Sequence, residues 1–296
     1  MSEICKDRTV IITGAGGGLG RAHALAFAAE GANVVVNDIN TEAADAVVAE
    51  ILALGGSAVA DTFDITDYAA CTKAVENAVA KFGDLHVVVN NAGINRDRMF
   101  ASMTEQEWDA IMAVHLKGHF CLSSNAVQYW RAQVKAGKKG SARIINTSSG
   151  AGLQGSVGQS NYAAAKAGIA ALTLNQAAEL GRYGITANAI TPAARTAMTT
   201  QVEVMAERMK KPDDGSFDYW DAGNVSPLLV WLGSEAASDV TGKVFEAEGG
   251  KISIADGWRT TEGVDKGDKW LPAEIGDAVA DLIAKEVPAQ PVYGTQ

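Results

Sequence analysis

The sequence predicts an α/β fold, a Rossmann-like doubly wound parallel sheet with helices on both faces. Short apolar stretches alternate with helical stretches along most of the chain, as repeated βα units require. Within the predicted strand at 85–90, Val87, Val88 and Val89 form a continuous apolar run, which is typical of a strand buried on both faces. Right-handed crossovers between such units place a ligand site at the carboxyl ends of the strands.

The first half of the chain shows the alternation most clearly. Apolar stretches predict strands at 9–13, 34–38, 57–61 and 85–90, and the segments between them predict helices over 21–30, 41–54 and 67–82. Thr104 and Glu107 have the spacing of a capping box. They are expected to begin a helix of about 30 residues that ends near Val134.

The second half continues with a strand at 143–149, a helix over 161–182 and a strand at 185–190. An irregular segment follows, about 194–224, which we interpret as a substrate lid. Within it, 196–211 is predicted to be helical, and its stripe of Met198, Val202, Met205 and Met209 fits either ordinary core or a mobile flap over an apolar substrate.

The last part of the chain is expected to hold a helix over 225–234 and a strand at 243–248. A C-terminal extension, about 258–296, contains one amphipathic helix over 272–287, which could cap the site or brace a neighbouring subunit. Since nothing resembles a linker, we expect a single dinucleotide-binding catalytic domain over 1–296.

Composition narrows the class of partner. The net charge of −10 argues against a nucleic acid or an anionic membrane surface. Cys5, Cys71 and Cys121 are scattered, so we expect reduced thiols and no metal site. The start of the chain lacks the apolar core of a signal peptide, and no apolar run is long enough to span a membrane. Cytoplasmic location is therefore the expectation.

A glycine-rich loop between the first strand and the first helix predicts a nucleotide site. Gly14, Gly18 and Gly20, with Leu19 between the last two, occupy Thr-Gly-x-x-x-Gly-x-Gly. Glycine leaves room for a pyrophosphate, and the following helix N-terminus offers free N–H groups. Asp38 lies 18 residues beyond Gly20, where a carboxylate accepts ribose hydroxyls and repels a 2′-phosphate. We therefore expect NAD; a flexible turn and a solvated carboxylate are the alternatives.

A second group of residues predicts acid–base chemistry. Ser149 follows an apolar strand, and Tyr162 and Lys166 have the i, i+4 spacing that puts both on one helix face. An ammonium near a phenol favours phenolate, so Tyr162 could exchange protons near neutral pH. Taken alone, the pair also fits a solvated lysine and a half-buried tyrosine.

Together these residues resemble the short-chain dehydrogenase/reductase family. The likeness covers roughly residues 6–257 and includes TGAGGGLG at 13–20, Asp38, Asp64-Ile65, NNAG at 90–93, Ser149, and Tyr162 with Lys166. A nearer likeness, through NNAGINRDRMF, AVHLKGHF and FEAEGG, is to the (3R)-hydroxyacyl-CoA dehydrogenase units of peroxisomal multifunctional enzymes, also described as 17β-hydroxysteroid dehydrogenases. The family implies a seven-stranded parallel sheet, and the nearer likeness implies an acyl-CoA or steroid substrate.

The resemblance also implies roles for single residues. Tyr162 would be the general acid/base, Lys166 would lower its pKa and bind the nicotinamide ribose, and Ser149 would hydrogen-bond the reacting oxygen. Further cofactor contacts would come from Asp64 and Ile65 beside the adenine, from Asn90, Asn91, Ala92 and Gly93 along the adenosine, and from Thr196 near the nicotinamide. A homodimer or homotetramer is implied as well.

Two positions depart from the family pattern. His115 stands where most members have an Asn that holds a relay water, so it could be structural or join a proton relay. The sequence Pro192-Ala-Ala-Arg-Thr196 replaces the usual Pro-Gly, which displaces Thr196 by one residue. Arg96, Arg98 and Arg195 are candidates for CoA phosphates or for exposed structural roles. A nucleotide-binding regulatory module without turnover and a generic secondary-alcohol or ketone reductase are the competing functions.

Overall fold

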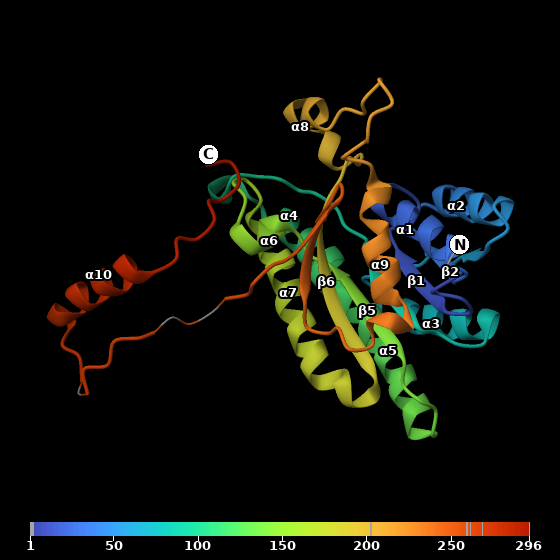
Figure 1. Cartoon of the computed structure of the whole chain (residues 1–296), viewed down its shortest axis with the longest axis horizontal. Helices are drawn as coiled ribbons and strands as arrows, with labels where there is room; N and C mark the ends of the chain where they lie inside the picture. The colour runs from blue at the N-terminus through green and yellow to red at the C-terminus, as the bar shows by residue number, and fades with distance from the viewer. Residues whose placement is uncertain (1–2, 202, 259, 261, 268, 296) are drawn as a thin grey trace.

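The computed structural model describes residues 3–295 except 202, 259, 261 and 268. It contains one eight-stranded sheet with strand order β3-β2-β1-β4-β5-β6-β7-β8 (Figure 1). The strands are β1 (Thr9–Thr13), β2 (Asn33–Asn37), β3 (Ser57–Ala60), β4 (Val87–Asn90), β5 (Ala142–Thr147), β6 (Ile185–Ala193), β7 (Val244–Glu248) and β8 (Lys251–Ile254). The Rossmann-like α/β prediction is confirmed.

Strand number departs from the expectation of seven parallel strands. β1 to β7 are parallel, but β8 pairs antiparallel with β7. The reason is the Gly249-Gly250 turn, where Gly249 has φ +51° and so allows the chain to reverse within two residues. Ile252 and Ile254 of this edge strand are more than half exposed.

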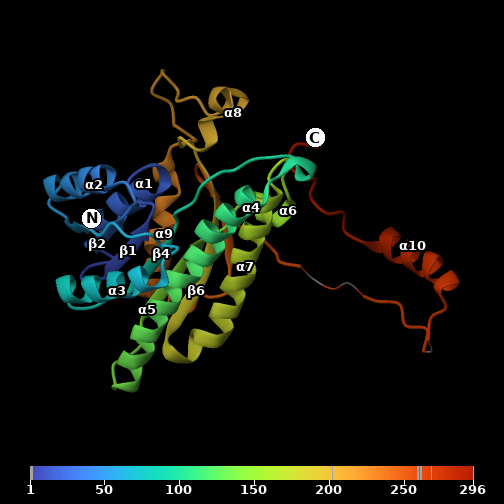
Figure 2. The ribbon, with the colours of Figure 1, turned by 180° about the vertical axis from the view of Figure 1, so that it is seen from behind.

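Helices cover both faces of the sheet (Figures 1 and 2). They are α1 (Gly18–Ala29), α2 (Thr41–Ala53), α3 (Tyr68–Phe82), α4 (Glu105–Ile111), α5 (Gly118–Lys135), α6 (Gly150–Gln154), α7 (Ser160–Leu180), α8 (Glu203–Arg208), α9 (Ser226–Gly233) and α10 (Ile275–Lys285). Single 3-10 turns occur at η1 (Phe100–Ser102), η3 (Gly181–Tyr183), η4 (Thr199–Gln201), η5 (Ala222–Asn224), η6 (Glu235–Ala237) and η7 (Pro272–Glu274), and η2 (Met112–Lys117) is a π-helix.

Two apolar cores lie on opposite faces of the sheet. One contains residues of α1, α2 and α9, and the other contains residues of α3, α5 and α7. Successive residues of β4 alternate between them, because Val87 and Val89 enter the first core and Val88 enters the second. This alternation explains why Val87, Val88 and Val89 are all apolar.

The helix predicted from the capping box is present, with an interruption. Thr104 and Glu107 form both reciprocal hydrogen bonds, and the helix runs from Glu105 to Lys135. Residues Met112–Lys117 in its middle are π-helical. Such wide turns are rare and occur mostly at functional sites.

The helix predicted over 196–211 is broken in the structure. Only η4 and the six-residue α8 form, because Thr199 bonds locally: its hydroxyl donates to the Ala194 carbonyl and accepts from the Thr196 amide. Met209 is buried, whereas Met198 and Met205 are partly buried. Val202 lies outside the described residues.

The C-terminal extension leaves the body of the molecule and then returns to it. η7 and α10 form the predicted helix, which stands away from the sheet on the α7 side (Figures 1 and 2). Ile275, Val279 and Ile283 on its apolar side are 40–59% exposed. Within the part of the chain that the structure describes, no helix combines the length and apolar character needed to cross a membrane.

Candidate active site

The predicted acid–base residues meet at the carboxyl end of β5. Ser149 is the N-cap of α6, and its hydroxyl accepts a hydrogen bond from the Ala151 amide at 3.2 Å. Tyr162 and Lys166 lie on the first turns of α7. The Ser148 hydroxyl donates to the Lys166 carbonyl at 2.8 Å, which ties the end of β5 to α7. The three side chains therefore come from the end of β5 and from α7.

Lys166 is buried, with 2% of its surface exposed. Its Nζ donates to the Thr147 carbonyl at 2.6 Å and lies 5.5 Å from the centroid of the Tyr162 ring. Burial lowers the pKa of Lys166 to about 7, because the charged form loses its hydration. The ammonium can therefore gain and lose its proton near neutral pH.

Tyr162 has a protected side chain beside the lysine. Burial raises the pKa of Tyr162, the Ser149 hydroxyl lowers it, and Asp97 adds a smaller upward contribution. The net direction is upward, so proximity of Lys166 alone does not make the phenol acidic. Lowering the pKa of Tyr162 would require further positive charge, which a bound ligand could bring.

His115 lies against the tyrosine, on the π-helical segment. The two rings meet edge to face with centroids 5.1 Å apart. Nε2 of His115 lies 3.1 Å from the Ile94 amide nitrogen and 2.8 Å from the Ile94 carbonyl oxygen. A methyl group at Gly93 would come within 2.5 Å of the imidazole, so glycine is required there. Burial, with a smaller effect of Lys166, lowers the pKa of His115 to about 3.

Several buried polar residues behind the site form contacts that the sequence did not predict. Asn90 donates to Asn146 and to Ser123, and Asn146 donates onward to Thr173. His119 lies one turn beyond His115, with Nε2 3.4 Å from the Thr147 amide. Asn90, expected along the adenosine, is thus occupied inside the protein. The signal available in sequence was polar residues at the ends of otherwise apolar strands.

The glycine loop has the geometry that a pyrophosphate cradle needs. Gly14 and Gly18 have φ of +62° and +51°, which favour glycine. A methyl group at Gly20 would lie 2.1 Å from the Gly14 carbonyl oxygen, so any larger residue would force the loop open. Helix α1 begins at Gly18 without a side-chain cap, which leaves its first N–H groups available to an anion. The residues present fit a dinucleotide phosphate.

Asn91 joins this loop to the next strand of the sheet. Its amide donates to the Thr13 carbonyl at 2.9 Å, and the Thr13 hydroxyl accepts from the backbone amides of Asn91 and Ala92. A methyl group at Gly14 would lie 2.8 Å from the Ala92 Cα, so the two segments are in close contact. Thr13 is a site residue that the sequence reasoning missed.

Asp38 lies beside the same loop. Its carboxylate accepts from the Gly16 amide and from the Asn40 amide, both at 3.0 Å. The structure therefore brings Asp38 to the glycine loop, as predicted.

The remaining predicted cofactor residues have different surroundings. Asp64 is exposed and accepts from the Thr66 amide, whereas Ile65 is buried against Gly118. Leu19 packs on the first core. Thr196 lies near Gly18, since a methyl group there would be 3.4 Å from the Thr196 methyl carbon.

The three arginines proposed for phosphates are engaged within the chain. Arg98 pairs with Glu107 at 2.8 Å, and Arg195 pairs with Asp218 and donates to the Met209 carbonyl. Arg96 donates to the Asn95 carbonyl. The Arg195 contacts link three parts of the irregular segment 194–224.

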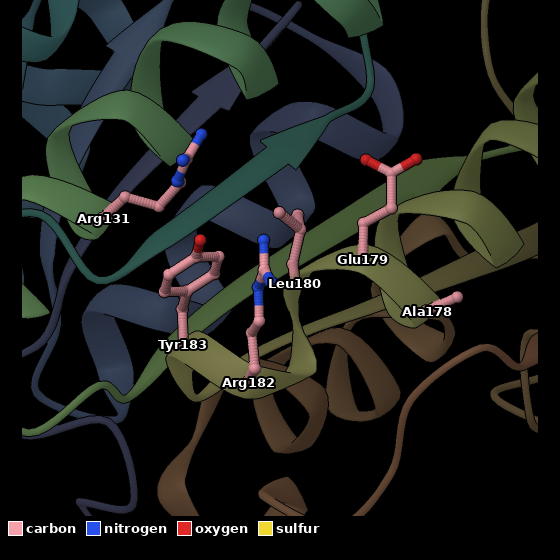
Figure 3. A pocket seen from close by; sticks show the side chains of 6 residues that line it. All are labelled: Arg131, Ala178, Glu179, Leu180, Arg182 and Tyr183. Carbon is pink, nitrogen blue, oxygen red and sulfur yellow. The ribbon is translucent and has the colours of Figure 1, made fainter.

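A separate hollow of about 440 Å³ lies at the opposite end of the sheet (Figure 3). Arg131 of α5 and Arg182 of η3 approach the Tyr183 ring, with guanidinium carbons 5.1 and 4.9 Å from its centroid. This hollow is at the amino ends of β5 and β6, remote from Ser149 and Tyr162.

Comparisons with known proteins agree with this geometry. The short chain dehydrogenase family matches residues 8–207. The chain is 43% identical to the hydroxyacyl-CoA dehydrogenase ChsB1 of Mycobacterium tuberculosis, over 97% of this chain and 92% of that protein. It is 48% identical, over 83% of its length, to the peroxisomal hydratase-dehydrogenase-epimerase of Saccharomyces cerevisiae, of which the match covers 26%. The crystal structure of a short chain dehydrogenase from Mycobacterium avium superposes with a TM-score of 0.90, at 56% identity, over 99% of this chain and 100% of that one.

The low pKa of His115 predicts a pH dependence of stability. The folded-state pKa of about 3 lies below the ordinary histidine pKa of 6.5, so between these values the unfolded chain binds a proton that the folded chain does not. Stability is complete above pH 6.5 and falls as the pH drops toward 3. Between pH 6.5 and 5, protonation of the unfolded His115 should lower the free energy of unfolding of the wild type by about 2 kcal/mol. In His115→Asn this contribution should be absent, which urea unfolding at both pH values would measure.

His23→Gln is the matched comparison. His23 is also buried with a pKa of about 3, but it lies on α1 and contacts Ser226. Both variants should flatten the profile, and an unchanged slope in His115→Asn would contradict a neutral His115.

Proposed function

Because the chain belongs to the short-chain dehydrogenase/reductase family and is an oxidoreductase, we propose that it transfers a hydride between NAD and the secondary alcohol of a 3-hydroxyacyl-CoA thioester. The observation that carries this proposal is the placement of Ser149, Tyr162 and Lys166 at the same strand edge as the glycine loop and Asp38. Hydride transfer requires the nicotinamide and the acid–base groups to lie next to the same substrate carbon. Their placement at one carboxyl edge of the sheet meets this requirement.

The side chains of the site would manage the proton and the charge on oxygen. A bound nicotinamide supplies the hydride acceptor, and its positive charge favours phenolate. Tyr162 removes the hydroxyl proton as the carbonyl forms, and Lys166 raises the positive potential around it. Ser149 hydrogen-bonds the reacting oxygen, an interaction often worth ~3 kcal/mol in the transition state. In the reverse direction Tyr162 returns the proton.

His115 would position Tyr162 without titrating. Its pKa of about 3 keeps the imidazole neutral at physiological pH, so it can donate or accept one hydrogen bond through Nε2 but carries no charge. We infer that it replaces the family Asn as a packing and hydrogen-bonding partner.

The choice of a CoA thioester follows from the relatives. ChsB1 is named a hydroxyacyl-CoA dehydrogenase, and the match to it spans nearly all of both chains. The paired state of Arg98 and Arg195 favours structural roles for them, so the CoA phosphates would be met by other groups or by solvent. A steroid alcohol is the competing substrate.

Substrate assays test the proposal directly. NADH formation should be fastest with (3R)-3-hydroxyacyl-CoA thioesters, compared with their (3S) enantiomers, with 17β-hydroxysteroids and with simple secondary alcohols. Activity confined to steroids would reassign the substrate. Binding of NADH with no oxidation of any alcohol in the panel would favour a regulatory nucleotide-binding module.

Removal of the Tyr162 hydroxyl should abolish most of the turnover. We expect Tyr162→Phe to lower kcat at least ~10²-fold, because proton transfer by a positioned group contributes that much. The KM for NAD should change little, which steady-state kinetics would measure. Tyr68→Phe, at an exposed tyrosine on α3, is the control. Nearly full turnover in Tyr162→Phe would remove Tyr162 from the mechanism.

Asp38 should set the preference between the two nicotinamide cofactors. A carboxylate next to the Gly16 amide would repel the 2′-phosphate of NADP, so Asp38→Ser should raise the ratio of kcat/KM for NADP to that for NAD at least ~10-fold. Asp45→Ser, at an exposed carboxylate on α2, is the comparison. An unchanged ratio in Asp38→Ser would show that another group reads the ribose.

Location, assembly and domain organisation follow as further proposals. We infer a cytoplasmic homodimer or homotetramer in which residues 1–296 form one catalytic domain, lid and C-terminal extension included. The exposed apolar side of α10 supports association. A helix of this length is only marginally stable in water by itself, so packing its apolar side on a second subunit would stabilise it.

A further inference from the structure

The last residues of the chain return to the loop that follows Ser149. Tyr293 forms an isolated parallel bridge with Ser156. The Tyr293 amide donates to the Gly155 carbonyl at 3.2 Å, and the Val157 amide donates to the Tyr293 carbonyl at 2.9 Å. The segment Val292–Gly294, here called the tail, thus adds a short strand-like pairing to the loop between Ser149 and Tyr162.

The fit between the tail and the loop is close at three glycines. A methyl group at Gly150 would lie 2.7 Å from the Tyr293 hydroxyl oxygen. One at Gly155 would lie 3.3 Å from a Val292 methyl, and one at Gly294 would lie 3.1 Å from the Val157 Cβ. Because an added methyl group would lie this close to the other segment at each of these glycines, the tail and the loop are closely packed.

Helix α6 lies between the tail and α7. On its other side, a methyl group at Gly152 would lie 2.6 Å from the Ala167 amide nitrogen, so α6 is also pressed against the turn of α7 that holds Lys166. A five-residue helix has too few hydrogen bonds to be stable by itself. The position of α6 therefore depends on the tail and on α7. Ser149 is the N-cap residue of α6, so its position depends on them as well.

We propose that the tail is part of the catalytic unit and that Tyr293 is a positioning residue, which holds α6 and thereby Ser149 in register with Tyr162. This inference rests on the proposed function, because Ser149 is given its role there. Tyr293 acts by packing its ring on Gly150, since no hydrogen bond of its hydroxyl is seen within the described residues.

The proposal separates two parts of the reaction. The nucleotide cradle belongs to the β1–α1 loop and to Asp38, and β4 separates β1 from β5 in the sheet. Loss of the tail should therefore disturb the reacting oxygen and leave cofactor binding intact.

The test compares Tyr293→Ala, Tyr293→Phe and the control Val287→Ala, which alters an 89% exposed residue of the same extension. We expect Tyr293→Ala to lower kcat at least ~10-fold through misplacement of Ser149, with the Kd for NADH unchanged. Tyr293→Phe should retain most of the turnover, because its ring still packs on Gly150. Val287→Ala should match the wild type.

Hydrogen exchange gives a readout that does not depend on turnover. Amides of residues 150–158 should be protected in the wild type and exchange faster in Tyr293→Ala. Rapid exchange in the wild type would overturn the proposal, as would a wild-type kcat in Tyr293→Ala despite faster exchange. An equal loss in Tyr293→Phe would give the hydroxyl a chemical role and overturn the packing role.

Failure of the proposed function would be distinguishable. If the wild type oxidised no alcohol, that function would fall, while protection of 150–158 and its loss in Tyr293→Ala would still support the placement of the tail.

Discussion

Burial of the Lys166 ammonium is the constraint on which the site depends. A charged amine away from water is stable only where its N–H groups are paired, and here the Thr147 carbonyl is the partner. That bond requires the first turns of α7 to lie against the end of β5. Tyr162, one turn earlier, is thereby fixed beside Ser149, and the Ser148 hydroxyl adds a second tie between strand and helix. The hydrogen bond of the Lys166 amine thus helps to orient Ser149, Tyr162 and Lys166 relative to one another.

The strand order brings the proposed nucleotide site close to the proposed acid–base residues. β4 stands between β1, which carries the glycine loop, and β5, which leads to Ser149. At its end Asn91 bonds to Thr13, while Asn90 bonds to Asn146 of β5. These side-chain bonds fix the spacing of three strand ends, and the spacing of the strand ends sets the distance between cofactor and acid–base groups.

Much of the fold could be predicted because its signals are local. Val87, Val88 and Val89 alternate between two cores, so all three had to be apolar. Asp38, Tyr162 and Lys166 could be selected as candidates, because the proposed chemistry needs given residue types at given spacings. The π-helix at Met112–Lys117, which contains His115, is not marked by any such spacing. The reversal at Gly249 and the pairing of Tyr293 join edges and distant segments, which periodicity does not encode.

The returning tail has a practical consequence for handling the protein. Because Thr295 lies two residues beyond Tyr293, a purification tag fused to the carboxyl terminus would emerge beside the loop that carries Ser149. The first described residues lie at the turn between α1 and β2, where the Cys5 amide donates to the Glu30 carbonyl (Figure 1). An amino-terminal fusion therefore leaves the rim of the reaction site clear.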